Sequence, residues 1–236
     1  MQFKCDALLL RYADFKESDR MVTLLTAEGK LSAAMKGVRK RGARLAFAAQ
    51  PFFFGEYVLN RTAGRNTVIS ADSYDGFYVL REDVFRFYAA AVVSEACDKL
   101  VYEDSESGAF LLLAVNTLKE LCSYAGRETG EPLVKFLLRA LSLAGYAVRA
   151  DRCPVCGNVP SGLLRFDMEE GAFFCADCNA GVRASENTYR AVHAVLRGER
   201  VEEGDGILRA LRLLGAYFTS RTDTAVSALK EYTALF

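Results

Sequence analysis

Hydrophobic and polar positions along the chain form three successive patterns, and the first of them predicts β-strands. The short apolar or β-branched runs within residues 1–80 cover 7–12, 20–26, 30–35, 52–59 and 67–74. Runs of this length, with glycine-containing connections between several of them, are typical of strands. Five short strands in one such segment predict a small barrel, and a five-stranded OB-fold barrel is the most economical arrangement.

From Glu82 onward the apolar residues recur with a period near 3.6, which predicts amphipathic helices. The helical pattern covers 84–96, 110–124, 133–147, 189–196, 207–218 and 225–235. Between the third and fourth of these segments, residues 151–182 have little periodicity and hold four cysteines. This third pattern therefore interrupts a helical region and does not end it.

The four cysteines of the interruption form two Cys-x-x-Cys pairs, Cys153 with Cys156 and Cys175 with Cys178, separated by 18 residues. Zinc is bound tetrahedrally by thiolates, and the spacing of the pairs lies in the range of four-cysteine zinc sites. Protein ligands would fill all four positions and leave none for water. We therefore expect one Zn²⁺ ion with a structural role.

The residues around the pairs support a ribbon. Gly157 and Asn179 follow the two pairs, and both residue types tolerate backbone conformations that turn N–H groups toward sulfur. Residues 163–166 and 172–174 predict two strands joined by a turn through 169–171. Two other chemistries stay open: thioredoxin-like redox activity, which the lack of a βαβ context disfavours, and an iron–sulfur cluster.

Together the patterns predict an α+β multidomain protein. We expect an OB-fold barrel over 1–80, a helical domain in two parts over 81–150 and 183–236, and a zinc-ribbon insertion over 151–182. Cys5, Cys97 and Cys122 are spread among apolar neighbours and are expected to be small buried residues. His193, the single histidine, is expected to be an ordinary helix residue.

Composition restricts the class of partner and the cellular compartment. Lys and Arg number 30, as do Asp and Glu, so the global charge indicates no class of partner. No run approaches the roughly 18 apolar residues of a membrane span, and the N-terminus lacks the order of a signal peptide. The odd count of seven cysteines argues against a secreted disulfide framework. These features predict a cytoplasmic protein.

One loop concentrates positive charge. Residues 36–44, between the third and fourth predicted strands, contain two glycines, no acid and five cations: Lys36, Arg39, Lys40, Arg41 and Arg44. Residues 1–80 hold 12 Lys and Arg against 8 Asp and Glu, a net charge of +4. A flexible cationic loop can follow a phosphate backbone without reading bases, so these five residues are candidate DNA ligands. The alternative is a solvated loop without a partner, which the absence of a compensating acid disfavours.

Phe52, Phe53 and Phe54 cannot all point inward on a strand, because alternate side chains face opposite sides. One face is therefore expected to present an aromatic ring to solvent, to another domain or to a base. Stacking of bases on aromatic rings is how OB-type barrels hold single strands. Packing against the helical domain is the other open possibility.

Three segments carry a resemblance to a known family. Residues 18–31 (SDRMVTLLTAEGKL), 36–40 (KGVRK) and 50–52 (QPF) resemble the N-terminal signature of the bacterial recombination mediator family RecO. The two cysteine pairs also match members of that family. The resemblance runs from about residue 7 to the C-terminal helices.

The resemblance implies a non-enzymatic, nucleoid-associated mediator that binds single- and double-stranded DNA and anneals complementary strands. It also implies binding of the acidic C-terminal tail of SSB, and cooperation with RecR, often with RecF, in loading RecA. The five cations of the loop match the family's DNA-facing segment, while Arg11, Arg20 and Lys30 are weaker candidates. For the SSB tail, which needs an apolar pocket rimmed by cations, the candidates are Lys135 and Arg139, one helical turn apart.

Two other functions remain open. An enzyme with an accessory zinc ribbon would need clustered carboxylates for magnesium. The acidic pairs 82–83, 103–104 and 169–170 are instead expected to be helix-end or turn charges, and the chain has no G-x-x-x-x-G-K-[ST] segment. The second is a protein-binding adaptor whose basic loop is incidental.

Overall fold

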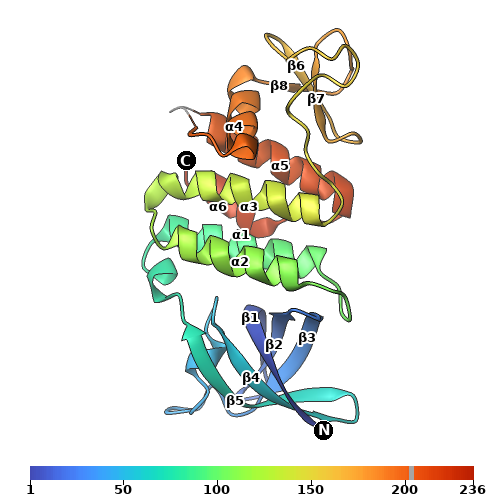
Figure 1. Ribbon diagram of the computed structural model, residues 1–236. Coiled ribbons are helices and arrows are strands. Elements are labelled where there is room, and N and C mark those ends of the chain that lie inside the picture. Colours follow the sequence, from blue (N-terminus) through green and yellow to red (C-terminus); the bar gives the residue numbers. More distant parts are fainter. Residues whose placement is uncertain (202–204) are drawn as a thin grey trace.

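The computed structural model describes residues 1–201 and 205–236. Figure 1 shows three parts stacked along one direction: a β-barrel, a layer of helices, and a small sheet beyond them. Among the described helices, none is long and apolar enough to cross a lipid bilayer. The fold class expected from the sequence is confirmed.

The barrel is built from five strands: β1 (Gln2–Phe15), β2 (Asp19–Thr26), β3 (Gly29–Met35), β4 (Phe54–Thr62) and β5 (Arg65–Asp75). It closes in the order β1-β2-β3-β5-β4, with a short parallel contact between β3 and β5, which is the OB-fold arrangement. Strand β1 is longer than its apolar run because its first half pairs with β4 and its second half with β2. The pairing partners, not the run itself, therefore determine its length.

The helical layer contains α1 (Val84–Leu100), α2 (Gly108–Leu121), α3 (Gly130–Leu143), α4 (Glu186–Arg197), α5 (Gly206–Thr222) and α6 (Ser227–Ala234). Each of the six predicted helical segments overlaps one of these helices. Asp83 caps α1 by accepting a hydrogen bond from Arg86 N at 2.9 Å. The end of α3 is followed by Gly145 in the left-handed conformation (φ +87°) that often terminates helices.

The barrel and the helices share one hydrophobic core. Leu8, Leu10 and Leu25 on the outside of the barrel are buried in the same cluster as the inner faces of α1, α2 and α3. Polar contacts reinforce the junction, since Ser107 Oγ donates to Thr26 O at 2.7 Å and Lys30 binds Asp98 of α1. The two parts are thus joined by packing as well as by the chain.

The phenylalanine run differs from the expected strand 52–59 in its first two residues. Strand β4 begins at Phe54, and Phe52 adopts a left-handed conformation (φ +67°), so the run does not follow strand alternation. Phe52 packs edge-on against Phe87 of α1, whereas Phe53 fills the barrel interior beside Tyr57. Both rings are buried, because the turn sends them into two different cores, so neither is offered to a base. Of the possibilities that the sequence left open, packing against the helical domain is confirmed for Phe52.

The cysteine segment forms a three-stranded sheet of β6 (Leu164–Asp167), β7 (Ala172–Cys175) and β8 (Val182–Ala184), in the order β7-β6-β8. The first two strands match the predicted ribbon, and the third was not predicted because it is only three residues long. On one face, Phe166 and Phe173 are fully buried, Phe166 against Tyr217 of α5 and Phe173 against Tyr189 of α4. The ribbon is therefore docked on the helices by an aromatic face.

Candidate metal centre and nucleic-acid surface

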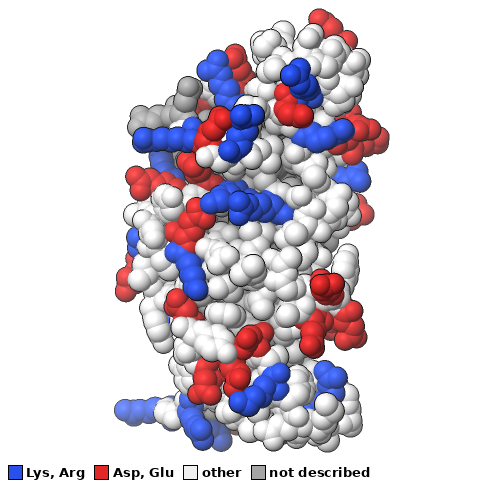
Figure 2. Space-filling view, viewed as in Figure 1, with Lys and Arg blue, Asp and Glu red and all other residues white. Residues whose placement is uncertain are grey.

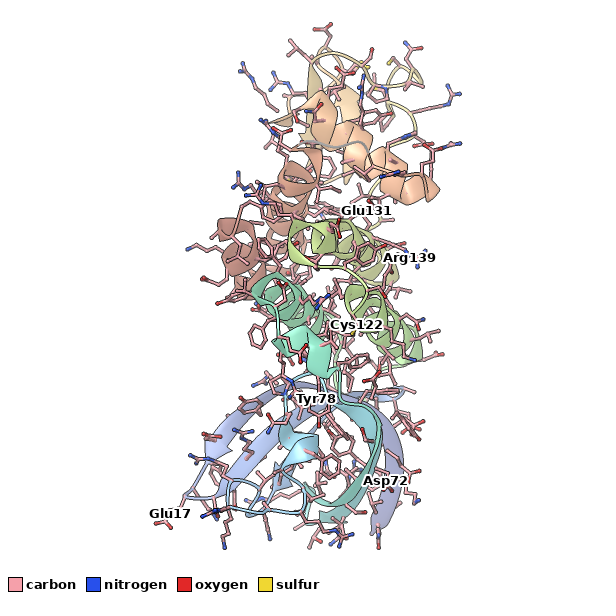
Figure 3. All side chains as sticks on the ribbon, turned by 90° about the vertical axis from the view of Figure 1, so that its left-hand side faces the viewer. Glu17, Asp72, Tyr78, Cys122, Glu131 and Arg139 are labelled. Carbon is pink, nitrogen blue, oxygen red and sulfur yellow. The ribbon has the colours of Figure 1, made fainter. Side chains whose placement is uncertain are left out.

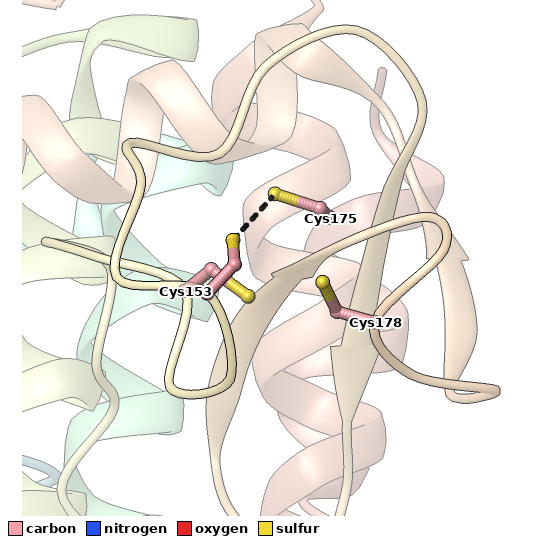
Figure 4. Close-up of side chains that lie close together, drawn as sticks. Cys153, Cys175 and Cys178 are labelled. Atoms are coloured by element: carbon pink, nitrogen blue, oxygen red, sulfur yellow. Dashed lines mark hydrogen bonds between the residues drawn. The ribbon is translucent and has the colours of Figure 1, made fainter.

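The four predicted metal ligands converge beside the end of β7, whose last residue is Cys175. Figure 4 labels Cys153, Cys175 and Cys178 of this cluster. Their Sγ atoms all lie within 4.8 Å of one another, and those of Cys156 and Cys175 are 3.7 Å apart. A tetrahedron with metal–sulfur bonds of about 2.3 Å has sulfur–sulfur edges of about 3.8 Å. A disulfide needs about 2.05 Å, so the arrangement fits a four-thiolate metal site and not a pair of disulfides.

Local backbone geometry creates this arrangement. The first pair ends in a turn in which Gly157 N donates to Cys153 O at 2.9 Å, and Gly157 is left-handed (φ +72°) as expected. In the second pair Cys178 N donates to Cys175 O at 3.0 Å. Asn179 is not left-handed; its side chain instead bonds Asp167 Oδ2 and Gly181 N, fastening the second turn to β6.

The thiols differ in how readily they ionise. Burial raises the pKa of Cys153, but backbone N–H groups of Cys156, Cys175 and Val155 outweigh that effect and lower the pKa to about 6. Burial and the neighbouring sulfurs raise the pKa of Cys175 to about 11 and that of Cys178 to about 12. Four thiolates this close repel one another, so complete ionisation requires a cation among them.

The remaining cysteines lie outside this cluster. Cys97 is buried in α1, and burial raises its pKa to about 12; burial likewise raises the pKa of Cys5 to about 11 and that of Cys122. Protonated, partly or fully buried thiols are poor nucleophiles, as expected for small apolar residues. His193 is half-buried on α4 and packs against the ring of Tyr189, 5.6 Å away.

Acidic side chains do not gather into a second site in the part of the chain that the structure describes, where only the cysteines form a group that could hold a metal. Asp83 is a helix cap, and Glu170 pairs with Arg149. The backbone N–H groups of Glu169 and Glu170 both donate to Asp167, which lowers the pKa of that carboxyl together with Asn179. Asp83 therefore lies at a helix end, and Glu169 and Glu170 lie at a turn, as the sequence predicted.

The basic loop lies between β3 and β4, and its five cations are all exposed. Figure 2 shows basic side chains projecting from the lower end of the molecule, where the barrel lies. Within the described residues, no ion pair involves Lys36, Lys40, Arg41 or Arg44. These four charges are therefore available to an anionic ligand.

Arg39 differs from its neighbours, because its Nε lies 3.3 Å from Asp14 Oδ2. The expectation that no acid compensates this loop is thus wrong for Arg39, since the acid comes from β1. The weaker candidates are also paired: Arg20 with Asp14 at 2.9 Å, and Arg11 and Lys30 with Asp98 at 2.9 and 3.2 Å. Asp98 lies 87 positions from Arg11 and 68 from Lys30, so these two pairs have no local signature in the sequence. Arg20 and Asp14 are six positions apart and meet across the β1–β2 hairpin.

Lys135 and Arg139 line a groove between α2 and α3 with a volume of about 370 Å³. Its apolar wall includes Leu112, which is 63% exposed, and Leu143. Lys135 is held by Glu120 of α2 at 3.0 Å, while Arg139, labelled in Figure 3, has no ion pair within the described residues. The two predicted residues are therefore brought to one half-apolar, cation-rimmed groove.

Comparison with known proteins places the chain among relatives along most of its length. A family model described as "Recombination protein O N terminal" matches residues 1–77, and one described as "Recombination protein O C terminal" matches residues 81–225. The DNA repair protein RecO of Myxococcus xanthus is 37% identical over 202 residues, covering 84% of this chain and 81% of its own length. That of Bacillus subtilis is 28% identical over 181 residues, covering 75% and 69% respectively.

Proposed function

The chain belongs to the RecO family of DNA repair and recombination proteins, and from that premise we propose that it is a cytoplasmic recombination mediator that acts without catalysis. It binds single- and double-stranded DNA and anneals complementary strands. It recognises the acidic tail of SSB and works with RecR, often with RecF, to help load RecA. The observation that carries this proposal is the exposed basic loop, in which four cations form no ion pair with any described residue.

The proposed mechanism is electrostatic. Lys36, Lys40, Arg41 and Arg44 neutralise phosphates of two strands and lower their mutual repulsion, so that complementary sequences can meet and pair. Phosphate contacts of this kind carry no sequence information, which suits a protein that must act on any gap. Arg39 has a different role, because its ion pair with Asp14 holds the loop in place.

The loop is tested by replacing three of these four cations, Lys40, Arg41 and Arg44, together with glutamine. Each lost phosphate contact lowers the slope of log affinity against log salt by about 0.7 for single strands and about 0.9 for duplexes. The triple variant should therefore lose a slope of about 2 on single strands, and it should anneal SSB-coated strands more slowly. The control is a triple glutamine variant of exposed cations on the helices: Lys119, Arg212 and Lys230.

Three outcomes decide between the candidate functions. An unchanged slope and affinity in the loop variant would support the protein-binding adaptor, whose basic loop is incidental. Cleavage of labelled DNA with a divalent cation would support an enzyme. A loss of DNA affinity and salt slope in the loop variant, with the helix control variant unchanged, supports the mediator.

We propose that the four cysteines hold one structural zinc ion. The sulfur–sulfur distances suit a single tetrahedral ion, and a cluster with bridging sulfides would hold the ligand sulfurs further apart than 4.8 Å. The ion stabilises four neighbouring thiolates and fixes the two turns of the ribbon. Metal analysis should give close to one zinc per chain, and a brown protein that contains iron would contradict this assignment.

We also propose that the groove between α2 and α3 receives the SSB tail. Acidic residues of the tail pair with Arg139 and Lys135, and its apolar end lies against Leu112 and Leu143. A labelled peptide that ends in acidic and aromatic residues should bind at least about tenfold more weakly to Arg139→Glu, since a desolvated charge contact is reversed. Lys119→Glu, also on α2 but outside the groove, should bind it normally.

A further inference from the structure

The hairpin between β1 and β2 is fastened directly to the basic loop. Arg39 N donates to Ser18 O at 2.9 Å, and Gly37 N donates to Asp19 Oδ1 at 2.7 Å. The Arg39 guanidinium also reaches Asp14, one residue before the end of β1. The turn of the hairpin and the cations of the loop therefore form one continuous surface at the end of the barrel, where Figure 3 labels Glu17.

Phe15, the last residue of β1, is the large aromatic side chain at this turn, and it is 46% exposed. The Nζ atom of Lys16 lies over this ring, 5.2 Å from its centre. No aromatic partner contacts its ring within the described residues. Tyr12 on the same strand is less accessible to a ligand, because the Arg20 guanidinium lies over its ring at 4.0 Å.

Charge divides this surface into two kinds of site. The loop is cationic, whereas the hairpin mixes both signs: Asp14, Glu17 and Asp19 lie beside Lys16 and Arg20, and Asp14 is paired with Arg20 and Arg39. A single strand whose phosphates lie on the loop can bring a base to the adjoining hairpin, where an exposed ring offers a stacking face. A duplex has its bases paired inside and cannot use that face.

We infer that Phe15 is a base-stacking residue for single-stranded DNA, beside the loop that holds the phosphates. The inference rests on the proposed DNA binding by the loop and adds a source of preference for single strands. Stacking on one aromatic ring changes affinity by about 5- to 100-fold and is insensitive to sequence. It adds no phosphate contact, so it leaves the salt slope unchanged.

The chain contains no tryptophan, so Phe15→Trp introduces a unique fluorophore at the turn. Stacking of thymine bases should quench its emission on binding of oligo(dT), and a blunt duplex of equal length should leave the emission almost unchanged. The matched control is Tyr102→Trp, at a side chain that is 73% exposed on the connection between α1 and α2, where neither ligand should quench. Equal quenching by both ligands, or none by oligo(dT), would overturn the inference.

Affinity measurements separate this inference from the proposed function. Phe15→Ala should weaken binding of the oligonucleotide about 5- to 100-fold with an unchanged salt slope, and Phe15→Trp should restore it. Duplex affinity should change less than about twofold. If the loop variant lowers the slope while Phe15→Ala has no effect, the stacking role is wrong and the DNA-binding proposal stands; if the loop variant has no effect, the DNA-binding proposal itself fails.

Discussion

Gly171, at the turn that enters β7, provides a sharp test of how the ribbon is docked. The residue is left-handed (φ +63°), and a Cβ added to it would lie 2.3 Å from Tyr217 Oη and 3.2 Å from Ala147 O. Gly162, just before β6, is left-handed as well (φ +73°), but a Cβ there meets no atom within 4 Å. The two positions therefore share a backbone conformation and differ in what surrounds them.

The structure gives an expected loss of folding free energy for each substitution to alanine. The left-handed conformation costs a residue with a Cβ about 1–2 kcal/mol, and Gly162→Ala carries this cost alone. Gly171→Ala adds the displacement of a buried tyrosine, and overpacking of this kind costs about 1–3 kcal/mol more. The total for Gly171→Ala is therefore about 2–5 kcal/mol, which in a chain of this size lowers Tm by about 4–20 °C, against about 2–8 °C for Gly162→Ala.

Thermal unfolding followed by circular dichroism measures the difference between the two variants. Release of metal to a chromogenic chelator, measured in parallel, reports whether the ribbon loosens with the helices. Equal Tm values for the two variants would show that β7 does not press on α5, and the docking described for the ribbon would be wrong.

Three further predictions concern other contacts. The Glu95 carboxylate accepts hydrogen bonds from Ser227 N and Ala228 N at the start of α6; burial raises its pKa, but bonds from Ala228, Lys99 and Ser227 outweigh burial and hold the pKa below the usual value. The stability it contributes is therefore present above a pH of about 4.3 and is lost as pH falls below it, so Glu95→Gln should cost about 1–2 kcal/mol at pH 7 and flatten the acid limb in urea titrations. Asp98→Ala should cost about 1–3 kcal/mol in the same assay because it strands the half-buried Lys30, whereas Glu56→Ala, in an exposed pair, should cost less than about 1 kcal/mol. A chelator should first raise proteolytic cleavage within residues 151–182 while the barrel stays intact. Simultaneous cleavage of the ribbon and the barrel would contradict a local role for the metal.

Much of the fold follows from the sequence because the deciding signals are local. Strand and helix periodicities predict the five barrel strands and the six α-helices of the described residues, and the spacing of two short motifs predicts four cysteines whose Sγ atoms lie within 4.8 Å of one another. What the sequence left open or missed depends on distant residues. Phe52 and Phe53 are buried because of a left-handed turn and two separate cores, and Arg39 is paired because β1 brings Asp14 beside it. Neither fact has a signature within a few residues of the side chain concerned.

The groove between α2 and α3 illustrates an intermediate case. The helical period places Lys135 and Arg139 on one face of α3, but the sequence does not say which helix lies opposite. That helix is α2, and its Leu112 and Glu120 supply the apolar wall and the partner of Lys135. A candidate site on a single element was thus predictable, whereas the composition of the complete site was not.

The contact between Glu95 and α6 has a consequence for how the protein is made. The residues that it joins are 132 and 133 positions apart, and α6 packs along α1, the first helix to leave the ribosome. The barrel can close as soon as β5 has emerged, but α1 must wait for almost the whole chain before its last face is covered. During that interval the nascent protein carries a finished barrel and a helix with one apolar face still uncovered. An exposed apolar face is the kind of surface that chaperones bind during translation.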